Sequence, residues 1–251
     1  MSIEKSIESS PSFQTSFASL SLHMTDKIRL LQFPSADIIS IREIIQTKWP
    51  LGIQDERMYA KSHEFKLRGN PWNAHGSDGI PARILMRSLL AHLYGKGWIL
   101  TASTDVSRKQ SDKDTLMFRK QVEPPLAKSM WMAISFSHSD RLRLMGAGDD
   151  LIMALRGMLK VMGLLQDESW KDRARDAYEF KLYGSPWWPT GESTMATRLL
   201  LLKMVEMLEK FGWSLYASVD QNNGHTEFSE TDSWYCVKDR DWVPGMPVVH
   251  R

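Results

Sequence analysis

Apolar and polar residues alternate along residues 17–24, and again along 27–30 after a short polar turn. A period of two is typical of β-strands, so this pattern predicts two strands joined by a tight turn. Between Ser35 and Trp49 the apolar residues recur every three or four positions, which predicts a helix with Ser35 as its N-cap. Pro50 and Gly52 end this helix.

The next strand lies in HEFKLRGNPW (63–72), where Gly69 and Pro71 stop the alternation and redirect the chain. A second helix follows from about Ile80 to Gly95. Two further strands are expected at 98–105 and 115–120. The predicted unit therefore has the order ββαβαββ, which is typical of an α+β sheet with helices on one face.

The same unit returns later in the chain, because HEFKLRGNPW recurs as YEFKLYGSPW at 178–187. The similarity between the two segments continues downstream, where Gly97-Trp98 matches Gly212-Trp213. The repeated unit is as long as a domain and too long for a solenoid repeat. We therefore predict a tandem duplication with mainly antiparallel sheets. The expected divisions are a disordered tail (1–16), a first repeat (17–120), a linker (121–130), a second repeat (131–238) and an irregular C-terminal tail (239–251). Helix 192–211 is apolar nearly all round, which favours burial between the two halves.

The composition is that of an ordinary globular protein, with 42% hydrophobic and 25% charged residues. A net charge of +2 is too small to indicate a nucleic-acid or membrane partner by itself. Cys236 is the only cysteine, so the chain can form neither an internal disulfide nor a Cys-rich zinc site. The histidines lack metal-ligand spacing, and we expect no metal or cofactor. Without a secretory signal or a transmembrane run, a cytoplasmic or nuclear location is expected.

The sheet face turned away from the helices is the first candidate binding surface. It is expected to carry Arg29, Lys66 and Arg68 in the first repeat, and Arg143, Lys181, Tyr183, Tyr216 and Tyr235 in the second. Basic side chains interleaved with aromatic ones can stack bases and contact phosphates of single-stranded nucleic acid. The same pattern also fits a solvated face of paired charges, or an interface with a protein.

The strand-to-helix corners are the second candidate. Trp72 ends GNPW (69–72), and Trp187 and Trp188 lie in GSPWWP (184–189). A Trp at such a corner either closes its own core or, if exposed, anchors a partner protein or enters a membrane interface. Trp188 is the one expected to be exposed, because Asn73 stands at the matching position.

A polar set is also duplicated: Glu64, Lys66, Arg83 and Asp105 match Glu179, Lys181, Arg198 and Asp220. Acid–base work would need these groups in one cleft, whereas an ordinary surface ladder would need only neighbouring strands. No catalytic motif accompanies them. The sequence therefore favours a non-catalytic binding or adaptor protein with a protein partner, and RNA binding on the sheet faces or lipid binding through Trp187-Trp188 are the alternatives.

Overall fold

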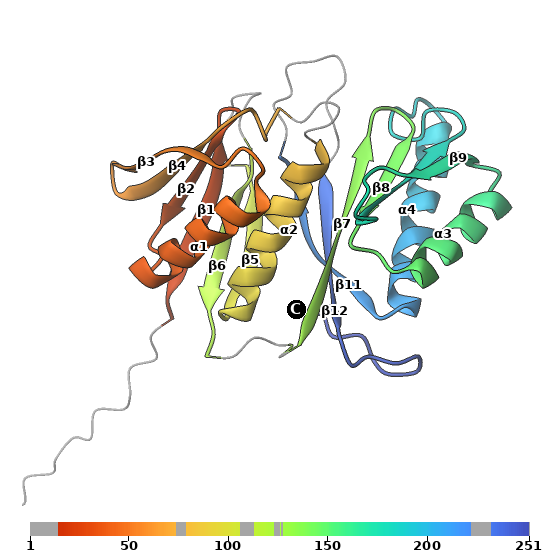
Figure 1. The fold of residues 1–251 in the computed structure, drawn as a ribbon. Coiled ribbons are helices and arrows are strands. Elements are labelled where there is room, and N and C mark those ends of the chain that lie inside the picture. The colour runs from red at the N-terminus through yellow and green to blue at the C-terminus, as the bar shows by residue number, and fades with distance from the viewer. Residues whose placement is uncertain are drawn as a thin grey trace, which may run out of the picture.

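The computed structural model describes residues 15–73, 79–105, 113–122, 126, 128–221 and 232–250, and it contains two six-stranded antiparallel sheets (Figure 1). The expected tail at 1–16 thus falls almost entirely outside the described residues. The first unit comprises β1 (Phe17–His23), β2 (Lys27–Leu31), α1 (Ser35–Lys48), β3 (Ile53–Tyr59), β4 (Ser62–Leu67), α2 (Gly79–Gly95), β5 (Trp98–Thr104) and β6 (Thr115–Lys120). The second comprises β7 (Ser129–Ser137), β8 (Arg141–Met145), α3 (Asp149–Val161), β9 (Leu165–Trp170), β10 (Ala177–Leu182), α4 (Ser193–Lys210), β11 (Trp213–Val219) and β12 (Ser233–Asp239).

The two sheets have the same topology. The strand order is β3-β4-β2-β1-β6-β5 in the first, and β9-β10-β8-β7-β12-β11 repeats it in the second. The predicted α+β duplication is confirmed. Each unit also has one strand more than expected, β3 or β9, at the edge of its sheet. These edge strands, IQDERMY and LQDESW, are mostly polar and exposed, so they lack the apolar alternation that marks a buried strand.

Each unit keeps its own two helices on one face of its own sheet. In the first unit Ile41 of α1 and Leu89 of α2 are buried with Phe65 and Phe118 of the sheet. In the second, Leu155 of α3 and Met204 of α4 are buried with Phe180. Burial of these aliphatic and aromatic side chains supplies the main driving force for folding each unit.

Helix α2 has a second role, because it also covers the reverse face of the second sheet and so lies between the two sheets (Figure 1). Its Tyr94 ring lies 5.4 Å from Trp131 and 5.5 Å from Tyr216, measured between centroids. Its Arg87 pairs with Asp176 at 2.9 Å. Nine of the 17 residues of α2 are buried. The first unit therefore packs its helical side onto the back of the second sheet.

Burial of the second unit's long helix between the halves was expected, and this prediction is wrong. Only Leu200, Met204 and Leu208 of α4 are buried, and its outer side is exposed. The physical reason lies in the sheets rather than in the helices. The back of the second sheet carries Ala133 and Ala177, which accept a packed helix, whereas the first sheet has Ser19 and Ser62 at the matching positions.

Candidate docking groove on the second unit

The predicted basic face of the first sheet is a network of paired charges around Glu64, whose side chain is buried. Arg29 donates to this carboxylate at 2.7 Å and Arg57 at 2.9 Å, and Lys27 lies at 3.7 Å. Burial raises the pKa of Glu64, but the hydrogen bonds from Arg29 and Arg57 outweigh it, and the pKa lies below its ordinary value. Lys66 is partly exposed and pairs loosely with Asp26, and Arg68 is exposed.

The second sheet repeats this network around Glu179. Arg143 donates to its carboxylate at 2.6 Å, Arg141 at 3.0 Å, and Lys171 lies at 3.3 Å. Burial again raises the pKa of Glu179, but the hydrogen bond and charge of Arg143 lower it by more, so the pKa lies below its ordinary value. Both carboxylates thus stay ionised near neutral pH, which suits a structural role rather than proton transfer.

The duplicated polar set does not form one site. Arg83 lies buried at the junction of the units, where its Nε is 3.1 Å from Ser233 Oγ, while its counterpart Arg198 is exposed on α4. Among the described residues no group of three or more His, Cys, Asp or Glu could hold a metal ion. Burial raises the pKa of the Cys236 thiol to about 12, so it is not a nucleophile at neutral pH.

Tyr216 and Tyr235 lie on the predicted face of the second sheet, but both are buried, so the expectation that this face is open around them is wrong. The Tyr216 hydroxyl accepts the Leu100 amide at 2.7 Å, and the Tyr235 hydroxyl donates to Gln221 at 2.6 Å. Helix α2 covers both rings, which belong to the buried cluster at the unit junction. Of the three predicted tyrosines only Tyr183 is exposed, and Lys181 is half-buried.

The tryptophan corners divide as the sequence indicated. Trp72 is fully buried, and its indole donates to the Lys27 carbonyl at 3.0 Å. Trp187 is half-buried, donates to the Arg141 carbonyl at 2.9 Å and packs edge-on against Phe136. Both therefore close the ends of their own cores. Trp188, in contrast, is 53% exposed.

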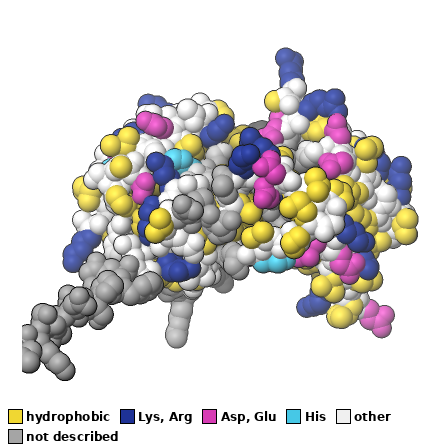
Figure 2. All heavy atoms as spheres, turned by 90° about the horizontal axis from the view of Figure 1, so that it is seen from below, with side chains coloured by type: hydrophobic (Ala, Val, Ile, Leu, Met, Phe, Trp, Pro, Cys, Tyr) yellow, Lys and Arg dark blue, Asp and Glu magenta, His cyan; other side chains and the backbone are white. Residues whose placement is uncertain are grey.

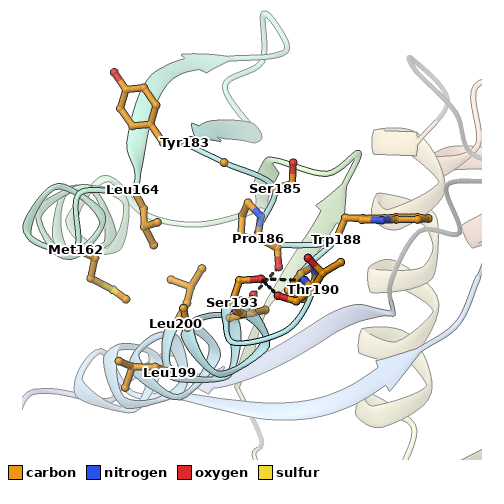
Figure 3. Close-up of a pocket in the computed structure, with 14 residues that line it drawn as sticks. Met162, Leu164, Tyr183, Ser185, Pro186, Trp188, Thr190, Ser193, Leu199 and Leu200 are labelled. Atoms are coloured by element: carbon orange, nitrogen blue, oxygen red, sulfur yellow. Dashed lines mark hydrogen bonds between the residues drawn. The ribbon is translucent and has the colours of Figure 1, made fainter.

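Beside the Trp188 corner lies an apolar pocket of about 430 Å³ (Figure 3). Met162 and Leu164, which follow the end of α3, face Leu199 and Leu200 of α4 across it. Ser193, in the first turn of α4, donates to the Thr190 carbonyl at 2.7 Å. These two polar residues at the edge of the pocket are therefore hydrogen-bonded to each other. The Trp188 ring extends away from Met162 and Leu164 (Figure 3).

A second hollow of about 520 Å³ continues this pocket between α3 and α4 and shares Met162 and Leu199 with it. We call the combined surface the α3–α4 groove; it comprises Met153, Gly157, Met158, Val161, Met162, Leu164, Leu199, Leu200 and Met207. Hydrophobic side chains gather on this side of the molecule, at the right of Figure 2. Val161 is 91% exposed, although valine is usually buried.

This groove was not among the predicted binding surfaces, yet the sequence of α3 contains one signal of it. Met153, Gly157 and Val161 recur every four residues on α3, on a different side from its buried residues Leu151, Leu155 and Leu159. A helix with a second apolar stripe outside its core stripe has an unpartnered face.

One protein-family domain model matches the chain twice, at residues 16–119 and at residues 130–237. No curated protein and no solved structure matches the chain. None of the described helices is both long and apolar enough to cross a membrane.

Proposed function

We propose that this chain, which belongs to the family whose domain it carries twice, is a non-catalytic binding protein whose second unit holds an amphipathic helix of a partner protein in the α3–α4 groove. The main support for this proposal is the set of large apolar side chains exposed along the groove. Met153 is 58% exposed and Leu199 is 51% exposed. Exposed apolar surface of this kind marks interaction sites on stable proteins.

The composition and length of the groove fit a helix. Four methionines line it, and their flexible side chains adapt to varied apolar partners. From Met153 to Val161 the groove follows α3 over nine residues, a rise of about 12 Å at 1.5 Å per residue. The pocket beside Pro186 extends it. Two to three turns of a partner helix would place apolar anchors at i, i+4 and i+7 along this length.

The rim of the groove sets the charge of the partner. Lys203 pairs with Glu206 at 2.8 Å, and Lys210 stands near the same carboxylate. Because Lys203 and Lys210 carry two positive charges and Glu206 carries one negative charge, the α4 edge of the groove has a net positive charge. A bound helix would therefore carry acidic residues on the flank that faces α4.

Selection from a library of helical peptides tests the proposal, with methyl NMR of [¹³C]methionine-labelled protein as the readout. We expect selected peptides to have an i, i+4, i+7 apolar pattern and to shift the methyl signals of Met153, Met158 and Met162. Val161→Glu should abolish binding. Val122→Glu is the matched control, since Val122 is fully exposed outside the groove. Peptides that bind both variants equally, or that leave these methyl signals in place, would contradict the proposal.

The first sheet favours a second candidate, RNA binding, because Lys27, Arg29 and Arg57 all gather around the single carboxylate of Glu64. It would appear as a salt-sensitive mobility shift of labelled single-stranded RNA that Arg29→Ala and Arg57→Ala weaken. Lipid binding through Trp188 would instead appear as a blue shift of Trp fluorescence with anionic vesicles, lost in Trp188→Ala.

A further inference from the structure

Helices α2 and α4 occupy the same place in their units, but their outer sides meet different surroundings. On α2 the outer positions Arg83, Met86, Leu90 and Tyr94 are all buried against the second sheet. The matching positions on α4, 115 residues later, are Arg198, Leu201, Val205 and Glu209. Arg198 and Glu209 are exposed and the other two are half-buried. The chain itself thus shows that this helix face can serve as a packing surface.

Leu202 belongs to the same exposed side and is 62% exposed. We call Arg198, Leu201, Leu202, Val205 and Glu209 the α4 stripe. Its residues fall at i, i+3, i+4, i+7 and i+11, so they lie on one side of the helix, turned away from Leu200, Met204 and Leu208 of the core. The stripe has an apolar middle with a cation at its N-terminal end and a carboxylate at its C-terminal end.

A copy of the first sheet is a poor cover for this stripe. Its reverse face is polar at Ser19 and Ser62, where the second sheet has alanines under α2. Packing α4 on that face of another molecule would also be head-to-tail, which builds an open array unless the rotation closes it.

A second α4 matches the stripe better, because four of its five residues pair with one another when the helix is reversed. Arg198 and Glu209 are equally far from its midpoint, and so are Leu202 and Val205. In an antiparallel pair of helices, Arg198 therefore faces Glu209 of the partner subunit, and Leu202 faces Val205 of the partner subunit. The apolar residues lie at the centre and the opposite charges at both ends, as in stable interfaces.

We propose that two copies of this chain associate about a two-fold axis through α4, with Leu202 and Val205 at the axis and Arg198 paired with Glu209 of the partner subunit. Glu209 also lies 3.3 Å from His250 in its own chain. A carboxylate has about four acceptor positions, so it can accept Arg198 of the partner subunit as well. Such a two-fold contact is closed and limits assembly to a dimer.

Sedimentation of the full chain over roughly 1–300 µM tests this dimer, a range that covers the affinities of small interfaces. The weight-average mass should rise from 28.9 kDa toward about twice that value. Leu202→Glu should keep the protein monomeric while leaving its circular dichroism unchanged, since the residue is mostly exposed. A monomer throughout the range, or a dimer unaffected by Leu202→Glu, would overturn the proposal.

Charge reversal tests the pairing itself. Arg198→Glu and Glu209→Arg should each weaken the dimer about 10-fold or more, because each removes two ion pairs per dimer and introduces like charges. The double variant should return to within about 3-fold of the wild type. Failure of the double variant to recover would rule out the antiparallel register. Val161→Glu, on the groove side of α3, should leave the dimer intact and so separates this contact from the proposed partner site.

Discussion

Truncation of Leu90 on α2 tests whether this helix is buried on both sides. Leu90 is 1% exposed, and it lies on the same helix side as Arg87 and Tyr94, which contact the second unit. Leu90→Ala removes about three methylene equivalents, or about 2.4 kcal/mol of transfer free energy at 0.8 kcal/mol each. A residual cavity between helix and sheet raises the expected loss in unfolding free energy to about 3–4 kcal/mol.

The matched control is Leu202→Ala on α4. The chemistry is the same and the residue lies on the corresponding side of the helix, but it is 62% exposed in the single chain. Its loss should stay below about 1 kcal/mol, since most of its surface already contacts water. Urea unfolding of both variants at low micromolar concentration, where the monomer prevails, measures the two losses. Losses that agree within about 0.5 kcal/mol would refute the burial of α2 between the sheets.

Three further predictions follow from the cores and the unit junction. Glu179→Gln should cost about 3 kcal/mol at neutral pH because it removes the charge partner of Arg143. The folded pKa of Glu179 lies below its unfolded value, so its contribution is present above about pH 4.3 and is lost as the pH falls through the folded pKa; acid titration of the wild type should show this loss and the variant should lack it. Cys236 should resist alkylation at pH 8 until the chain is unfolded, and fast labelling of the native protein would contradict its burial. Gly146→Ala should destabilise the protein more than Gly184→Ala. Both glycines have a positive φ, 83° at Gly146 and 73° at Gly184, but only at Gly146 would a Cβ displace Arg87 from the unit junction. Equal shifts in melting temperature would argue against that contact.

Most of each unit could be predicted from periodicity alone. The apolar alternation at residues 115–120 gave β6 with its observed bounds, and the helical spacing after Ser35 gave α1. Strands β3 and β9 were not predicted, because an edge strand needs no apolar face. Their polar and charged residues therefore show no regular alternation of burial. Local pattern therefore predicts elements that face a core and misses those that face water.

The binding surface could not be predicted in the same way, because it depends on which faces meet after each unit has formed. The alternation placed Tyr235 correctly on the side away from Cys236, but nothing in its own strand indicated that α2 would cover that side. The apolar sequence of α4 was compatible with burial between the units. The two alanines on the back of the second sheet, which receive α2 instead, become informative only when the sheets are compared with each other.

Methionine methyl groups test the central claim most directly, namely that α2 is covered by the second sheet while the outer sides of α3 and α4 are exposed to solvent. In [¹³C]methionine-labelled protein at low concentration, a soluble gadolinium chelate broadens only the methyl signals that it can approach. Met86 on α2 is fully buried, whereas Met153 on α3 is 58% exposed and Met195 on α4 is 65% exposed. We predict strong broadening of Met153 and Met195 and a nearly unchanged Met86 signal. Broadening of Met86 to the same extent as Met195 would contradict the arrangement on which both proposed contacts depend.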